Sequence, residues 1–392
     1  MKKYPLVPLG ELGEIVTGST PDSTNKEYWN GDIAWITPAD LTNHEGIYFT
    51  GKLRKITEAG YKSCSTKLMP AGSIVYSTRA PIGHCAVTSF PLCTNQGFKS
   101  IVPNKRLDAV YGFFALKFFT PQLEALGRGA TFAEVNKETF ESFEIPLPPL
   151  SEQKRIASLL ARADRLRGLR RAAREQCDSL LQSVFLEMFG DYLNKIECQF
   201  ADVLQIPLTN GFFEKNEKYG TGNPIVWVDN LYHTNIIDIS ALRRVQVSEK
   251  ELEKYEVFDG DLLFTRSSLV AEGVGQANIV PKLEERTMFE SHIIRARVDK
   301  TKINPYYALG LFRSQFGKSE IMKRAKTATM TTIGQDALYE FPCPIPPLAL
   351  QEEFARVVAR VEALRARMDE SARQGEALFQ SLLAESFGGD VT

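Results

Sequence analysis

Hydroxyl and basic side chains stand next to one another at one place in each half of the chain. The residues are Ser77, Thr78 and Arg79 in the first half, and Thr265, Arg266 and Ser267 in the second. An arginine can donate two hydrogen bonds to the edge of a guanine base, and hydroxyl groups and lysines suit phosphate oxygens. Both segments therefore have the composition of nucleic-acid contacts, although solvated turns share that composition.

A second polar and basic segment follows in each half, shortly before a proline-rich sequence. Its candidate contact residues are Arg128 and Thr131 in the first half, and Lys323, Lys326 and Thr327 in the second. Because both halves place basic residues at the same two points of their sequence, the pattern favours a binding role over chance.

The sequence lacks the familiar motifs of catalysis. The nearest approach to a G-x-x-x-x-G-K-[ST] phosphate loop runs from Gly310 to Ser319, but six residues rather than four separate its glycines. The Asn/Asp-Pro-Pro-aromatic sequence of amino-methyltransferases is missing. The four histidines are isolated, and His84-Cys85 with Cys93 makes a poor metal half-site because no second pair accompanies it. We therefore expect a binding protein rather than an enzyme, with no cofactor and no metal.

Length and composition are typical of a globular protein with two or three domains. The 392 residues are 43% hydrophobic and 24% charged, and no apolar run is long enough to predict a membrane span. No secretory signal follows the start, and the six scattered cysteines form no C-x-x-C pair, so we expect a cytoplasmic protein with free thiols. The net charge of −1 argues against an overall basic DNA-binding protein but permits a local basic surface.

The chain contains one sequence pattern twice. Residues 146–190 match residues 344–388 at 17 of 45 positions, with an offset of 198 and no gap. Upstream of each copy the likeness is weaker but keeps its order. The upstream pairs are 72–77 with 260–265, 33–36 with 225–228, and Gly18 with Gly211. Each half is therefore predicted as a variable globular region followed by a shared scaffold segment.

Each scaffold segment predicts a long helix after a proline pair, which cannot lie inside a helix. The helices are expected to span about 38 residues, or roughly 57 Å, with Ser151 offering an N-cap to the first. Apolar residues at heptad spacing predict a seam for another helix. They are Ile156, Leu159, Ala163, Leu166, Ala173, Cys177, Leu180 and Val184 in the first copy, and Phe354, Val357, Val361, Leu364, Met368, Leu378 and Leu382 in the second. Net charges of +2 for 151–191 and −3 for 349–392 favour pairing of the two helices.

More apolar side chains lie beside this seam and are candidate contacts for partner helices. These are Leu160, Leu169, Leu181, Phe185 and Leu383. A stripe wider than a two-helix seam can serve a further protein. The alternative is that both helices belong to one core without an outside partner.

The two globular regions are predicted as mixed strand and helix. Strands are expected near 32–36, 73–77 and 97–102 in the first region, and near 224–229, 260–265 and 289–298 in the second. Helices are expected near 110–119 and 305–316. The aromatic residues of the first helix suit a core better than base stacking.

Together these features resemble the specificity subunits of type I restriction–modification enzymes, over the whole chain. The resemblance is carried by the exits Ile145–Leu150 and Pro344–Leu348, by the helix starts Ser151-Glu152-Gln153 and Leu350-Gln351-Glu352, and by the order globular–helix–globular–helix. The second copy departs with Ala349 in place of serine, which weakens that helix start.

The resemblance implies an α+β protein with an internal pseudo-twofold repeat. Residues 1–145 and 192–343 are expected to be target recognition domains that read the two halves of an asymmetric double-stranded DNA site. Residues 146–191 and 344–392 are expected to hold the proline-rich exits and two spacer helices in an antiparallel coiled coil. Two methyltransferase subunits and restriction translocase subunits are the implied partners, and these use S-adenosylmethionine and ATP.

Two alternatives remain from the residues alone. The chain can be a coiled-coil adaptor whose globular halves hold proteins, in which case it binds no DNA even beside a methyltransferase. It can also be a nuclease or methyltransferase of unfamiliar type, in which case the purified chain is catalytic by itself.

Overall fold

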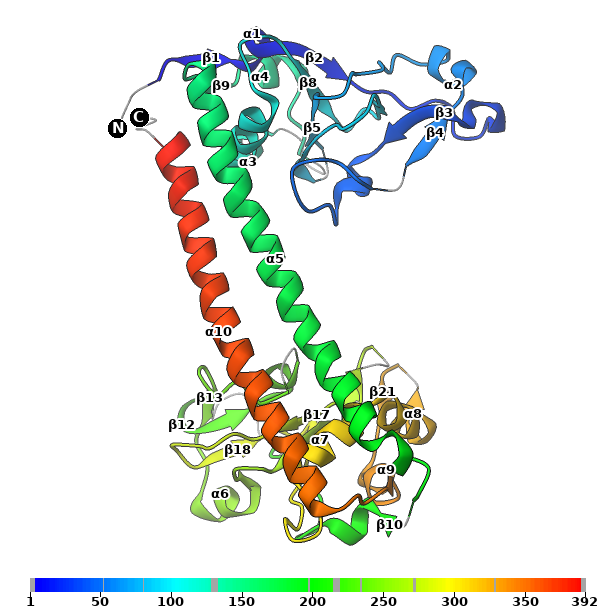
Figure 1. Ribbon diagram of the computed structural model, residues 1–392, viewed down its shortest axis with the longest axis vertical. Helices are drawn as coiled ribbons and strands as arrows, with labels where there is room; N and C mark the ends of the chain where they lie inside the picture. Colours follow the sequence, from blue (N-terminus) through cyan, green and yellow to red (C-terminus); the bar gives the residue numbers. More distant parts are fainter. Residues whose placement is uncertain are drawn as a thin grey trace. The chain divides into compact units, whose positions relative to one another are not determined.

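A computed structural model describes residues 4–51, 53–79, 81–127, 133–196, 198–213, 219–232, 235–270, 273–327 and 329–388 (Figure 1). The chain forms two compact units. Unit 1 contains residues 1–173 and 368–392, and unit 2 contains residues 174–367. The boundary between the two units cuts through both long helices. The four predicted parts kept each helix whole, so the predicted domain boundaries stay a prediction.

Unit 1 is a mixed α/β structure with two main sheets, in the strand orders β2-β8-β5-β6 and β4-β3-β7. Its strands are β1 (Leu6–Pro8), β2 (Gly13–Thr17), β3 (Trp29–Ile36), β4 (Arg54–Ile56), β5 (Ile74–Thr78), β6 (Ile82–Val87), β7 (Cys93–Thr94), β8 (Lys99–Pro103) and β9 (Glu144–Pro146). Its helical elements are α1 (Leu9–Leu12), η1 (Lys26–Tyr28), η2 (Pro38–Leu41), α2 (Glu58–Lys62), α3 (Ala109–Ala125) and α4 (Lys137–Ser142). The predicted strands and the helix near 110–119 are confirmed.

Unit 2 repeats this plan, with the strand orders β11-β19-β15-β17 and β13-β12-β18-β14. Its strands are β10 (Cys198–Gln199), β11 (Thr209–Asn210), β12 (Tyr219–Val226), β13 (Arg243–Val245), β14 (Glu256–Val257), β15 (Leu262–Thr265), β16 (Ser267–Ser268), β17 (Ala277–Ile279), β18 (Thr287–Phe289), β19 (Ile293–Ala296), β20 (Lys326–Thr327), β21 (Thr331–Thr332) and β22 (Pro342–Cys343). Its helical elements are η3 (Gly190–Tyr192), η4 (Phe200–Val203), η6 (Val228–Leu231), α6 (Glu249–Tyr255), α7 (Pro305–Arg313), α8 (Gln315–Arg324) and α9 (Gln335–Tyr339). The predicted repeat of a mixed α/β region is confirmed.

Two glycines mark the same close approach of backbones in the two units. A Cβ atom added to Gly18 would lie 2.1 Å from the carbonyl oxygen of Asn95, and one added to Gly211 would lie 2.1 Å from that of Glu290. Any larger residue would push the neighbouring strand away, so only glycine fits at either place. The predicted correspondence of Gly18 and Gly211 is confirmed.

Helices α5 (Leu150–Phe189) and α10 (Leu348–Phe387) confirm the two predicted long helices, at 40 residues each. Within unit 1 they run antiparallel, because Arg167 pairs with Glu376 at 2.6 Å and Arg170 donates a hydrogen bond to the carbonyl of Ser371. In unit 2, Phe185 and Phe189 near the C-terminal end of α5 pack against Phe354 near the N-terminal end of α10. The contacts in unit 1 confirm the predicted antiparallel pairing, and those in unit 2 agree with it.

The predicted seam of α5 is wrong at several positions. Leu159, Leu166 and Leu180 are 39%, 53% and 47% exposed, whereas Leu160 and Phe185 are buried. The reason is that α5 packs against the globular part of each unit as well as against α10, so its buried stripe follows that combined surface. A straight helix also drifts by about 20° per heptad from a strict seven-residue repeat.

A buried glutamine fixes the start of each long helix. Gln153 accepts a hydrogen bond from the backbone N–H of Asp108 at 2.8 Å and donates to the carbonyl of Pro148 at 2.9 Å. Gln351 makes the matching bonds, from the N–H of Asn304 at 2.8 Å and to the carbonyl of Pro346 at 2.7 Å. Ser151 lies inside α5 rather than before it, so the predicted serine cap is wrong. The bonds of Gln153 instead tie the helix start to the backbone just before α3.

Aromatic side chains join the end of each long helix to a globular region. In unit 1, Phe387 lies 5.2 Å from Tyr111 of α3, and α3 lies beside the first part of α5 (Figure 1). In unit 2, Phe189 lies 4.7 Å from Tyr307 of α7 and 5.5 Å from Phe354. Each globular core is therefore completed by the C-terminal end of the helix that begins in the other unit.

Replacement of Phe189 by alanine tests this joint. Phe189 is fully buried, so Phe189→Ala is expected to lower the free energy of unfolding by about 3–5 kcal/mol. Leu186→Ala, on the same turn but 61% exposed, is the matched control and is expected to cost under about 1 kcal/mol. Urea unfolding of both variants measures this difference. Equal losses in the free energy of unfolding would contradict the proposed role of the aromatic contacts.

Candidate nucleic-acid interface

The structure brings the two basic segments of unit 2 together in one small sheet. Strand β16, which follows Thr265 and Arg266, pairs antiparallel with β21 through Ser267 and Thr332. Strand β21 in turn pairs with β20, where Lys326 faces Thr332. Two segments more than fifty residues apart in sequence thereby share one surface, as the repeated composition suggested.

This sheet borders a groove of about 700 Å³, called the basic groove below. It is lined by Arg266, Ser267, His292, Arg324, Lys326, Met330, Thr332, Ile333, Gly334, Asp336, Ala337 and Glu340. Within the described residues, Arg266 and Lys326 are exposed and make no ion pair. Their positive charge is therefore available to an outside anion.

Ser267 and Lys323 are less free than Arg266. The Ser267 hydroxyl lies 3.1 Å from Nδ1 of His292, so these two side chains share a hydrogen bond in the groove. Lys323 pairs with Glu320, which also binds Arg324 at 2.8 Å. Hydrogen bonds from Lys323 and Arg324 lower the pKa of Glu320, so it stays charged and partly neutralises both cations.

Thr265 and Ser77 build the loops rather than line a surface, because both are fully buried. The Thr265 hydroxyl donates to the carbonyl of Gly273 at 2.7 Å and accepts from the N–H of Gln276 at 2.9 Å. The Ser77 hydroxyl donates to the carbonyl of Pro81 at 2.7 Å and accepts from the N–H of His84 at 2.9 Å. These matching bonds make Ser77 and Thr265 equivalent residues.

This equivalence confirms the predicted pairing of 72–77 with 260–265 and extends it to the two arginines. The N–H of Val135 donates to the carbonyl of Thr78, and the N–H of Ile333 donates to that of Arg266, so Thr78 and Arg266 correspond. Arg79 therefore matches Ser267 and not Arg266. The exposed arginine of this segment therefore stands one position later in unit 1 than in unit 2.

The corresponding surface of unit 1 is described only in part. Arg79 is exposed and forms a β-bridge with Glu134, in the place that Ser267 and Thr332 take in unit 2. Thr78 is fully buried. Arg128 and Thr131, predicted as contacts, lie outside the described residues.

The predicted partner contacts on the helices divide into two groups. Leu169 is 56% exposed and stays a candidate. Leu160, Leu181, Phe185 and Leu383 are at most 9% exposed, because they pack into the cores of their own units. These four are not available at the surface, and we restrict the prediction to Leu169.

Sequence reasoning missed an arginine–tryptophan pair that occurs in both units. Arg54 on β4 lies 4.9 Å from the ring centre of Trp35, and Arg243 on β13 lies 4.4 Å from that of Trp227. Cation–π contact holds each guanidinium in place at the rim of a hairpin. The sequence showed a tryptophan in both halves, but in each unit the arginine that contacts it lies on the following strand.

The predicted alignment of the two tryptophans is wrong by two residues. Strand β3 pairs with β7 at Ile36, and β12 pairs with β18 at Val226, so Ile36 corresponds to Val226. Trp227 thus stands two residues beyond the place of Trp35. An offset of two keeps both rings on the same face of the strand, which is why both reach an arginine.

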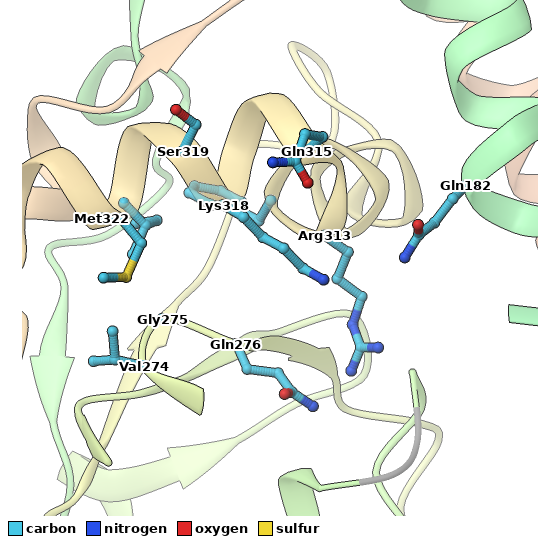
Figure 2. A pocket seen from close by; sticks show the side chains of 11 residues that line it. Gln182, Val274, Gly275, Gln276, Arg313, Gln315, Lys318, Ser319 and Met322 are labelled. Atoms are coloured by element: carbon cyan, nitrogen blue, oxygen red, sulfur yellow. The ribbon is translucent and has the colours of Figure 1, made fainter. Parts of the chain in front are cut away.

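A second cavity of unit 2, of about 480 Å³, has a mixed polar and apolar lining (Figure 2). Figure 2 shows Lys318 of α8 and Arg313 at the end of α7 reaching into it, with Gln276 on the facing turn. Arg313 donates to the carbonyl of Ala277 at 2.7 Å, and Gln276 donates to that of Leu231 at 2.8 Å. These bonds fix the turn that leads into β17.

The described residues contain no group of three His, Cys, Asp or Glu side chains that could hold a metal ion. In the same part of the chain, no helix is long and apolar enough to cross a membrane.

Comparison with known proteins places the chain in a family. The model of the type I restriction modification DNA specificity domain matches residues 1–176 and 197–370. The chain therefore belongs to the family of type I restriction–modification specificity proteins.

Two relatives show how much of such proteins the chain matches. The specificity subunit of the type I restriction enzyme MjaIX of Methanocaldococcus jannaschii is 36% identical over 228 residues, or 58% of this chain and 50% of that protein. The EcoKI specificity subunit of Escherichia coli K12 is 26% identical over 366 residues, or 84% of this chain and 76% of that protein. The matched part thus spans half the length of the first relative.

Solved structures share the fold. The S subunit of a type I restriction–modification system from M. genitalium superposes with a TM-score of 0.55 at 14% identity, over 99% of this chain and 97% of that one. A chain from a study of complex assembly and conformational transition of the type I R-M system gives 0.60 at 18%, over 98% and 97%. The predicted fold class is confirmed.

Thr265→Val tests whether this hydroxyl builds the loop. The variant keeps the shape of the side chain but leaves the N–H of Gln276 and the carbonyl of Gly273 without this partner, which is expected to cost about 1–3 kcal/mol of stability. Thr329→Val, at an exposed site of the same unit, is expected to change stability by less than about 0.5 kcal/mol. Thermal unfolding compares the two, and an unchanged Thr265→Val melting temperature would contradict the role.

Proposed function

We propose that this chain is the DNA-recognition subunit of a type I restriction–modification complex. Each globular region reads one half of a double-stranded DNA site, and the two long helices carry the partners. The observation that carries the proposal is the basic groove, where Arg266 and Lys326 from distant segments converge without ion pairs. Membership of the specificity family supports it.

The two units differ, which supports an asymmetric bipartite site. Arg266 of unit 2 takes the place of the buried Thr78, and Ser267 takes that of the exposed Arg79. Different side chains at equivalent places contact different base edges. The contacts proposed for unit 1 are Arg79, Arg128 and Thr131, and those for unit 2 are Arg266, Ser267, Lys323, Lys326 and Thr327.

The chain is proposed to be non-catalytic, cytoplasmic and free of cofactors of its own. Two methyltransferase subunits would dock on the helices, with Leu169 among the contacts, and translocase subunits would join that complex. A net charge of −1 suits this division of labour, since the partners then supply much of the attraction to phosphate.

The salt dependence of DNA binding tests the groove directly. In the complex with the methyltransferase, Arg266→Ala and Lys326→Ala are each expected to weaken DNA binding and to reduce the salt slope by about one, because each removes a phosphate-neutralising charge. Fluorescence anisotropy at 50–200 mM salt, a range in which slopes are about −0.9 per contact, measures the effect.

Lys282→Ala is the matched control, since Lys282 is exposed in unit 2 and outside the groove. It is expected to leave affinity and salt slope unchanged. If Lys282→Ala lost as much DNA affinity as Arg266→Ala, binding would depend on the general charge of the unit and not on the basic groove. A complex that assembles but binds no DNA would overturn the proposal and favour a protein adaptor.

A further inference from the structure

Unit 2 carries an exposed apolar pair directly beside the basic groove. Leu269 is 81% exposed and Val270 is 63% exposed, and both follow strand β16. With Met330 and Tyr232 they line a second cleft of about 650 Å³, the apolar cleft. Exposed apolar side chains gathered at one place mark contact surfaces in soluble proteins.

The apolar cleft is continuous with the basic groove. Ser267, His292 and Met330 line both. A ligand held by Arg266 and Lys326 in the groove therefore reaches Leu269 without crossing any other element. The described residues that line the apolar cleft include no carboxylate.

Buried hydroxyl groups fix the backbone at Val270 and Gly273. The backbone N–H of Val270 donates to the hydroxyl of Ser268 at 3.2 Å, and the N–H of Gly273 donates to the carbonyl of Val270 at 2.9 Å. Thr265 fixes the carbonyl of Gly273 from below. A Cβ atom at Gly273 would lie 2.5 Å from the Ser268 hydroxyl, so this base of the loop is closely packed.

Unit 1 has no counterpart to the pair. Its equivalent loop has five residues between Ser77 and Gly83, whereas nine lie between Thr265 and Gly275. Both glycines have positive φ, +99° and +66°; Gly83 lies at the start of β6 and Gly275 lies just before the matching strand β17. The four extra residues of unit 2 bring in Leu269 and Val270, so the apolar contact belongs to one half of the DNA site only.

We propose that Leu269 and Val270 contact the 5-methyl group of a thymine in the half-site read by unit 2. The inference rests on the proposed function. The major groove offers one apolar group, the thymine methyl, among hydrogen-bonding base edges. Aliphatic side chains that lie beside phosphate-binding cations can contact this methyl group, while Arg266 and Lys326 position the DNA backbone.

Replacing thymine by deoxyuridine tests the contact, because it removes the methyl group and keeps the Watson–Crick edge. Each thymine of the recognised site is replaced in turn, and binding is measured with the intact methyltransferase complex. At one position in one half-site, the wild-type complex is expected to lose about fourfold in affinity, the worth of one buried methyl-sized group. With Leu269→Ala or Val270→Ala, the same replacement is expected to have little further effect.

Thymines of the other half-site are the DNA control, and Met322→Ala, 40% exposed on α8, is the protein control. Neither is expected to change the uracil effect. Specific binding without any uracil effect coupled to Leu269 or Val270 overturns this inference alone. The inference is also overturned if Leu269 inserts as a wedge between base pairs, which would show as a DNA bend that Leu269→Ala abolishes. It is likewise overturned if the pair holds the methyltransferase, which would show as weaker assembly of the complex. Failure to bind any specific site overturns the proposed function as well.

Discussion

Each globular core depends on the burial of a helix end that the chain supplies from far away in sequence. Phe189 closes the core of unit 2 beside Tyr307, and Phe387 takes the same place beside Tyr111 in unit 1. A domain that lacks this helix end would leave α3 or α7 with an open apolar face. The two long helices, α5 and α10, are therefore part of both cores. They also complete the scaffold that supports α8 and β20, which border the basic groove.

The same constraint explains which polar groups are buried. Buried backbone N–H and carbonyl groups around the two helix starts need partners. Gln153 and Gln351 accept from the N–H of Asp108 and of Asn304 and donate to the carbonyls of Pro148 and Pro346. Both glutamines are almost fully buried. Thr265 and Ser77 do the same for the loops that carry the candidate contacts. At the helix starts and in the loops, a buried polar side chain therefore fixes the backbone. In the loops, the exposed arginines that follow, Arg266 and Arg79, are free to bind.

The sequence predicted the duplication, the mixed α/β units and the long helices, because heptad spacing and the proline-rich exits are local signals. It failed where the outcome depends on packing at a distance. Leu159 and Leu160 are adjacent and equally apolar, and only the globular surface decides that Leu160 is buried. The pairing of 72–77 with 260–265 could be predicted, and hydrogen bonds from His84 and Gln276 confirm that Ser77 and Thr265 correspond. The contact of Arg243 with Trp227 could not be predicted, because Arg243 lies on β13 and Trp227 follows the end of β12.

The central claim is that this chain reads a defined, two-part DNA sequence for a methyltransferase. The most direct test is to co-express the chain with its candidate methyltransferase subunit and to map methylated adenines across the host genome by long-read sequencing. The account predicts one bipartite motif with a fixed gap, whose two halves are unrelated in sequence. A stable complex that methylates no defined motif would contradict it.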